Sequence, residues 1–132
     1  MRLNEKSIFK GGVAMSIVRG SIYLANMPLI NNSSVQGGVR PVVVVQNNKG
    51  NTYSPTVQVV PLTTRNKKSL PVHMCICGNG LKQKSTLLTE QIQTIDKTAL
   101  KQYLGMVNDE TMNEINHCIA MQLGLILSNG QD

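Results

Sequence analysis

The chain of 132 residues has no tryptophan and few other aromatic residues, namely three tyrosines and one phenylalanine. RNA-binding modules that stack bases need aromatic side chains, so this composition weakens the case for such a binder. No apolar run approaches the roughly 18 residues that a membrane-spanning helix needs, and the longest covers residues 42–45. Residues 1–16 lack the continuous apolar stretch of a secretory signal, because Gly11 and Gly12 interrupt them. We therefore expect no membrane segment and no signal peptide.

Cysteine is also scarce, and the three cysteines lack disulfide-type spacing, which favours a reducing cytoplasm. His73, Cys75 and Cys77 would share one face of a strand and are the sharpest candidate metal ligands. Structural zinc sites need four ligands and usually separate two cysteines by two to four residues, and alternate residues of a flat strand seldom converge on one ion. Two buried thiols and a hydrogen-bonded histidine are the favoured interpretation, so we predict no metal and no cofactor.

Acidic residues are outnumbered, with 7 against 13 lysines and arginines, which gives a net charge of +6. A small basic domain attracts nucleic acid, an anionic membrane face or an acidic peptide, although charge can also serve solubility alone. The sequence contains no nucleotide-binding glycine loop, no paired carboxylates at catalytic spacing and no Ser/His/Asp arrangement. The charge therefore suggests a nucleic-acid partner without proving it.

Short segments rich in β-forming residues alternate with turn-forming segments along most of the chain. The predicted strands cover residues 17–25, 41–46, 56–62, 71–77 and 86–93. Many short strands at this spacing favour a mainly β fold built as a small antiparallel barrel. We expect residues 1–15 to be a flexible extension, residues 16–128 to be one domain and residues 129–132 to be a short tail.

Two helices are predicted near the C-terminus. Asp96 can cap a short helix over residues 97–104 that stops at Gly105. Asn108 or Asp109 can cap a longer helix that runs to about Leu127, with an apolar stripe wider than a surface helix needs. Such a face could cover the barrel and still contact a second subunit, which favours a homodimer over a helix buried wholly in its own domain.

Arg40 is the first candidate for chemistry, because it follows a glycine pair and opens the valine-rich strand at the barrel rim. A planar guanidinium matches a phosphate bidentately, and a surface arginine paired with a carboxylate is the alternative. Thr63 and Thr64 end another strand, where hydroxyls can donate to phosphate oxygens or simply close the strand. The basic residues that follow them are Arg65, Lys67 and Lys68.

Five motifs in a fixed order resemble the MazF/PemK family of toxin endoribonucleases. They are RGSIY at 19–23, QGGVRPVVVVQN at 36–47, GNTYSPTV at 50–57 followed by Leu62-Thr63, LPVH at 70–73, and LTEQIQTIDK at 88–97. The resemblance covers about residues 17–127. It implies a small SH3-like, CcdB/PemK-type barrel with C-terminal helices, assembled as a homodimer.

The resemblance also implies sequence-specific, metal-independent cleavage of single-stranded RNA, chiefly messenger RNA, to 2′,3′-cyclic phosphate and 5′-hydroxyl ends. An antitoxin of the MazE type would occupy the RNA groove. Arg40 and Thr63 stand at the two main catalytic positions of the family. Positions that shape its RNA site correspond to Ser34, Gln36, Thr64 and Gln91.

The chain departs from the family pattern at several positions. Ser21 and Val35 stand where some members have acidic residues, and Cys75 and Cys77 replace typical polar strand residues. No clear match exists for the catalytic aspartate of PemK-like members, so the general base is unassigned. Two alternative functions follow from the shared barrel: a CcdB-like gyrase poison, whose C-terminal tryptophan this chain lacks, and a catalytically inactive RNA-binding barrel.

Overall fold

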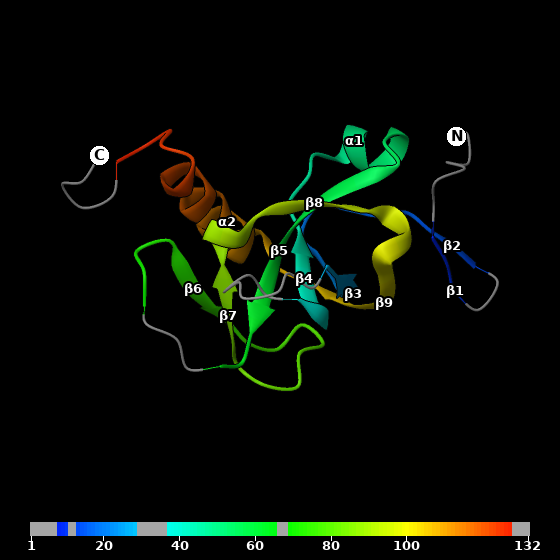
Figure 1. Ribbon diagram of the computed structural model, residues 1–132, viewed down its shortest axis with the longest axis horizontal. Helices are drawn as coiled ribbons and strands as arrows, with labels where there is room; N and C mark the ends of the chain where they lie inside the picture. The colour runs from blue at the N-terminus through cyan, green and yellow to red at the C-terminus, as the bar shows by residue number, and fades with distance from the viewer. Residues whose placement is uncertain (1–7, 11–12, 29–36, 66–68, 128–132) are drawn as a thin grey trace.

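A computed structural model describes residues 8–10, 13–28, 37–65 and 69–127 (Figure 1). Seven strands form one antiparallel sheet: β3 (Ser21–Met27), β4 (Gly38–Val44), β5 (Thr56–Thr63), β6 (His73–Ile76), β7 (Ser85–Leu88), β8 (Gln93–Asp96) and β9 (Leu100–Met106). The helical elements are α1 (Asn48–Tyr53), α2 (Asp109–Gln122) and the two 3₁₀ turns η1 (Thr89–Gln91) and η2 (Lys97–Ala99). The mainly β fold with a C-terminal helix, as predicted, is confirmed.

Two further strands, β1 (Ile8–Lys10) and β2 (Val13–Met15), pair with each other in a separate hairpin at one end of the molecule (Figure 1). This hairpin lies within residues 1–15, which we expect to be an extension. The division into extension, domain and tail stays a prediction.

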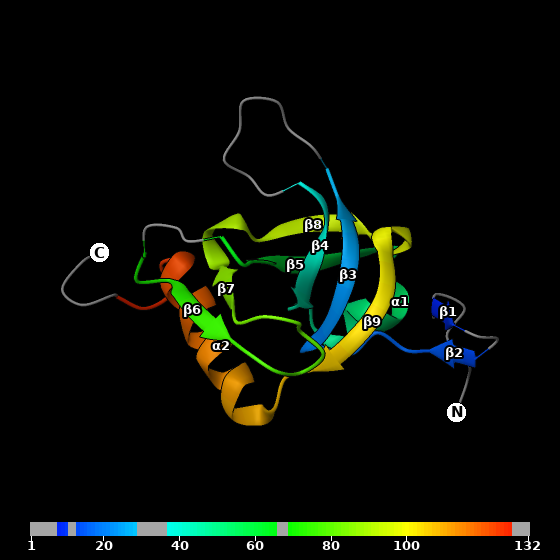
Figure 2. The same cartoon turned by 90° about the horizontal axis from the view of Figure 1, so that it is seen from below.

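The strand order of the main sheet is β6-β7-β5-β4-β3-β9, and β8 pairs with β5 beside β7. Strand β5 is therefore central, because it pairs with β4 along one edge and with both β7 and β8 along the other. The sheet bends strongly (Figure 2), yet among the described residues no strand pairing joins β6 to β9. The predicted barrel is thus an open, curved sheet.

The loop between β6 and β7 packs against the backbone of β9 near the open side of the sheet. A Cβ atom added at Gly80 would overlap the carbonyl group of Leu104, and one added at Gly105 would overlap the carbonyl group of Asn79. Gly78, Asn79 and Gly80 all adopt positive φ angles, of 72°, 55° and 87°. Glycine takes this conformation readily. Gly80 combines a positive φ with the close approach to Leu104, so this position requires glycine.

The core forms on both faces of the central strands. Tyr23, Val42 and Val59 belong to one buried cluster. Val43 and Val60 belong to a second cluster, which also contains Ile115 of α2. A strand covered on both faces carries a nearly continuous apolar run instead of alternating residues. The four consecutive valines of the β4 segment are buried for this reason.

The predicted helix over residues 97–104 is wrong. Only the short turn η2 forms, and the chain then enters β9, where Tyr103 lies opposite Tyr23. Asp96 makes no capping hydrogen bond with its side chain. Pairing with β3 satisfies backbone groups along one edge of this segment, so tertiary context overrides the local cap and stop signals.

The long C-terminal helix is confirmed at its start, where the Asn108 side chain accepts a hydrogen bond from the N–H of Thr111. It ends at Gln122, earlier than the predicted Leu127. Gly124 follows with a φ of 75°, which is the left-handed conformation that terminates many helices. The short helix α1 forms between two predicted strands, where we expect a turn. It begins after Asn47, whose side chain accepts a hydrogen bond from the N–H of Gly50.

Candidate functional site

The two main candidate residues stand at the same end of the neighbouring strands β4 and β5. The pairing of these strands ends at Val42 and Pro61, and Arg40 and Thr63 each lie two residues beyond that last pair. Both follow or precede the buried core segments of their strands, which hold their backbones.

The Arg40 side chain is partly buried, and its Nε donates to the carbonyl oxygen of Gly37 at 2.8 Å. This bond orients the guanidinium through the nitrogen nearest the chain. Among the described residues, no carboxylate forms an ion pair with Arg40. Burial, and secondly the positive charge of Arg65, lower the pKa of Arg40 from its ordinary value. An arginine still carries its charge at neutral pH, so the group can hold an anion but cannot readily accept a proton.

Thr63 is almost fully buried and its hydroxyl has a defined role. The backbone N–H of Arg65 donates to Thr63 Oγ1 at 3.1 Å. Because this contact uses an acceptor position of the hydroxyl, the hydroxyl proton is available for donation to another group. Thr64 and Arg65 are exposed. Arg40, Thr63 and Arg65 therefore form a cluster with two positive charges and one hydroxyl donor.

Gln91 lies in a bulge beside β5. Leu87 is opposite Leu62 and Gln93 is opposite Val59, so residues 88–92 span the length occupied by residues 60 and 61 alone. The extra chain forms η1, which carries Gln91 in a half-buried position. In the order of the sheet, β5 separates Gln91 from Arg40. Four further candidates, Ser34, Gln36, Lys67 and Lys68, lie outside the described residues.

The predicted hydrogen-bonded histidine is confirmed, because His73 Nε2 lies 2.8 Å from Glu90 Oε1. The prediction of buried thiols at Cys75 and Cys77 is wrong, since both are exposed. Strand β6 is the edge of the sheet, and Ile76 is the residue that it buries. Across the described parts of the chain, no three His, Cys, Asp or Glu residues gather as a metal site would require.

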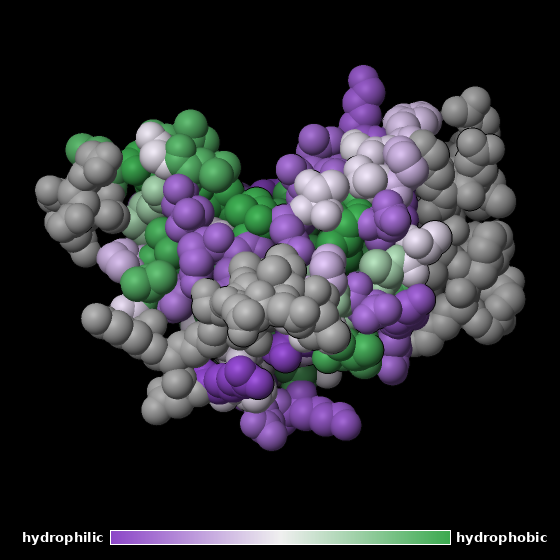
Figure 3. Space-filling view, in the orientation of Figure 1, coloured by the Kyte–Doolittle hydropathy of each residue, from purple (hydrophilic) through white to green (hydrophobic). Residues whose placement is uncertain are grey.

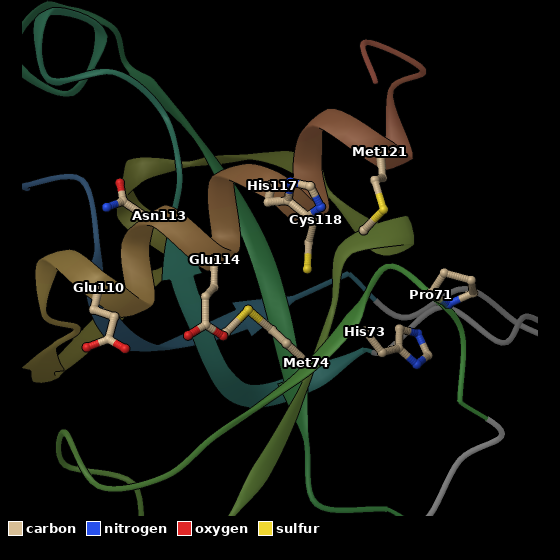
Figure 4. A pocket seen from close by; sticks show the side chains of 9 residues that line it. All are labelled: Pro71, His73, Met74, Glu110, Asn113, Glu114, His117, Cys118 and Met121. Carbon is tan, nitrogen blue, oxygen red and sulfur yellow. The ribbon is translucent and has the colours of Figure 1, made fainter. Parts of the chain in front are cut away.

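Sequence reasoning missed a groove of about 560 Å³ between α2 and the start of β6 (Figure 4). One wall is formed by Pro71, His73 and Met74. The opposite wall belongs to α2 and consists of Glu110, Asn113, Glu114, His117, Cys118 and Met121. Glu110, Asn113, Glu114 and His117 recur at helical spacing, and this pattern could have indicated a polar face of α2 beside its apolar stripe. Burial, followed by the charge of Glu114, raises the pKa of the Cys118 thiol.

None of the helices in the described ranges is both long and apolar enough to cross a membrane.

Comparison with known proteins places these features in a family. The model of the PemK-like, MazF-like toxins of type II toxin-antitoxin systems matches residues 18–123. Endoribonuclease MazF of Staphylococcus saprophyticus is 46% identical over 110 residues, which cover 81% of this chain and 91% of that protein.

Solved structures show the same fold. An endoribonuclease from Mycobacterial species has a TM-score of 0.67 and 28% identity, covering 83% of this chain and 92% of its own. An endoribonuclease in complex with its cognate antitoxin, also from Mycobacterial species, has a TM-score of 0.66 and 29% identity, with coverage of 85% and 97%. The chain therefore belongs to the family of PemK-like, MazF-like toxins of type II toxin-antitoxin systems.

Proposed function

We propose that this chain cleaves single-stranded RNA, chiefly messenger RNA, at a short recognition sequence and without a metal ion. The coarser activity follows from the family and from the 46% identical relative: the chain is a MazF-type toxin endoribonuclease of a toxin-antitoxin system. The observation that supports the finer proposal is that Arg40 and Thr63 stand at the same end of β4 and β5, with Arg65 hydrogen-bonded to Thr63 and close enough to Arg40 for its charge to lower the pKa of Arg40. This arrangement offers cationic and hydroxyl donors to a phosphate without an ion of its own.

In the proposed reaction, the 2′-hydroxyl of the RNA attacks the adjacent phosphate. The bond to the 5′-oxygen breaks, which leaves a 2′,3′-cyclic phosphate and a 5′-hydroxyl. Arg40 stabilises the negative charge of the pentavalent phosphorane, and Thr63 donates a second hydrogen bond to it. Arg40 is a poor general base because it stays protonated. A phosphate oxygen of the substrate or a water molecule therefore accepts the 2′-hydroxyl proton in this scheme and passes it to the departing 5′-oxygen.

Incubation of the purified protein with a long single-stranded RNA in EDTA, followed by mapping of the cut ends, tests the proposal. We expect cleavage at one short motif with cyclic-phosphate ends, undiminished by EDTA. Strong inhibition by EDTA would contradict metal independence. Binding without cleavage would favour an inactive RNA-binding barrel, and trapping of gyrase without any effect on RNA would favour a gyrase poison.

The partners belong to the proposal as well. One solved relative is an endoribonuclease in complex with its cognate antitoxin, which supports an antitoxin as the partner here. The proposal names an antitoxin of the MazE type and a cytoplasmic location. A homodimer is supported by the exposed apolar residues that follow α2, where Leu125 is 74% and Leu127 69% exposed. Figure 3 shows apolar surface gathered at this end of α2. A second subunit that covers this surface would remove it from water.

We expect the basic segment after Thr63 to follow the RNA backbone. Replacing Lys67 and Lys68 together by alanine should weaken RNA binding and make it less sensitive to salt. Each lost phosphate contact should flatten the slope of log affinity against log salt by about 0.7 for a single strand. Titration of a labelled RNA at several salt concentrations measures this slope, and a slope equal to that of the unmodified protein would rule out this role.

A further inference from the structure

The side chain of His73 connects three segments of the chain. It is only 6% exposed, although it starts the edge strand β6. The backbone N–H of Leu70 donates to Nδ1 at 3.3 Å, and the N–H of His73 donates to the carbonyl oxygen of Leu70 at 2.9 Å. On the other side of the ring, Nε2 lies 2.8 Å from Oε1 of Glu90 in η1. A single ring is thus bonded to the turn just before β6 and to the η1 turn.

These contacts define the state of the imidazole ring. A backbone N–H can only donate, so Nδ1 of His73 must accept and cannot carry the proton. The proton therefore sits on Nε2, which donates it to the Glu90 carboxylate. Both ring nitrogens are used, and the ring cannot rotate without breaking one of the bonds.

Turn η1 carries a residue of the proposed RNA site, because Glu90 directly precedes Gln91. This turn lies between β7 and β8, and no ladder pairing joins it to β5. The hydrogen bond from His73 to Glu90 is a contact outside the ladder that holds the turn.

We propose that His73 is a positioning residue that holds η1, and with it Gln91, against the turn before β6, so that Gln91 is in place to receive the RNA strand. This inference rests on the proposed function, since it names the residue that preorganises the same site. Arg40 and Thr63 are held by β4 and β5, independently of His73. His73 therefore acts on RNA binding and leaves the chemical step unaffected. Without His73 the η1 turn is not held in place, and ordering it when the RNA binds costs binding free energy.

Steady-state cleavage of a short RNA that contains the recognised motif tests this role. For His73→Ala we expect KM to rise about tenfold, in line with the loss of a charge-assisted hydrogen bond, and kcat to stay within about twofold. Binding of the same RNA with a 2′-deoxy sugar at the cut site should weaken by the same factor. Glu90→Ala should raise KM in the same way, because it breaks the same hydrogen bond.

Conservative variants distinguish positioning from mere stabilisation. In His73→Gln the side-chain amide can still donate to Glu90, and in His73→Asn the amide oxygen can still accept from Leu70, so each should recover part of the KM loss. Gln46→Ala is the matched control, because Gln46 bonds to Asn51 and Thr56 far from η1. We expect it to lower the melting temperature without changing KM.

An unchanged KM in folded His73→Ala, or a loss confined to kcat, would overturn the inference. If His73→Ala does not fold, an unchanged KM in both His73→Gln and Glu90→Ala would overturn it equally. Failure of the proposed function looks different, because the unmodified protein would then not cleave RNA at all.

Discussion

Replacing Arg40 by alanine is expected to reduce RNA cleavage by about 100- to 1,000-fold while the protein stays folded. The factor is that found when one preorganised donor to a transition-state anion is removed. In the folded protein, Arg40 donates to the carbonyl oxygen of Gly37, a contact worth about 1 kcal/mol, so most of the loss should be in activity rather than stability. Single-turnover cleavage of a defined RNA measures the effect, and circular dichroism confirms the fold.

Two further variants make this result specific. Arg40→Lys keeps the charge but loses the planar fork, so its activity should fall between those of the alanine variant and the unmodified protein. Lys82→Ala removes an exposed cation elsewhere and should leave cleavage unchanged. Full cleavage by a folded Arg40→Ala protein would refute the role of Arg40 in the reaction.

Replacing Gly80 by alanine is expected to lower the free energy of unfolding by about 2–5 kcal/mol. The left-handed conformation at a φ of 87° contributes about 1–2 kcal/mol of this for a residue with a Cβ atom. The rest comes from the Leu104 carbonyl group, which the new methyl group would displace, at the cost of about 1–3 kcal/mol typical of overpacking. Urea unfolding measures the change.

The loop itself contains the matched control. Gly78 has a similar φ of 72°, but nothing lies within 4 Å of a Cβ added there. Gly78→Ala should therefore show the conformational cost alone. Equal losses at Gly78 and Gly80 would mean that the contact with β9 contributes nothing to stability.

Much of the fold could be predicted from the sequence where local pattern and tertiary environment agree. The valine run that begins at Val42 indicates a buried strand, and Asn108 marks the start of the long helix. The segment at 97–104 could not be predicted this way, because its capping signals favour a helix while β3 offers it backbone partners along one edge. The end of the long helix was overestimated because the apolar residues after Gly124 continue the stripe without continuing the helix.

Motifs propose the members of the candidate site, but they do not predict its geometry. Arg40 and Thr63 stand out through motifs, yet their place at one end of the paired strands depends on the register of β4 and β5, which are joined through α1 rather than by a tight turn. The contact between His73 and Glu90 spans 17 positions and arises from the bulge at η1. Neither the residue types nor their spacing in the sequence predicts such a bulge.

The double-sided burial of β4 and β5 has a consequence for how a toxin of this kind can change over time. Arg40 and Thr63 adjoin valine stretches that are 0% exposed, whereas Thr64, Arg65 and Gln91 lie in a loop and a bulge. Segments of the latter kind open locally at low free energy and tolerate substitution, while the central strands open only with the whole domain. The residues proposed to act in bond breaking are thus inherited with the core, and the residues proposed to contact the RNA are free to diversify around them.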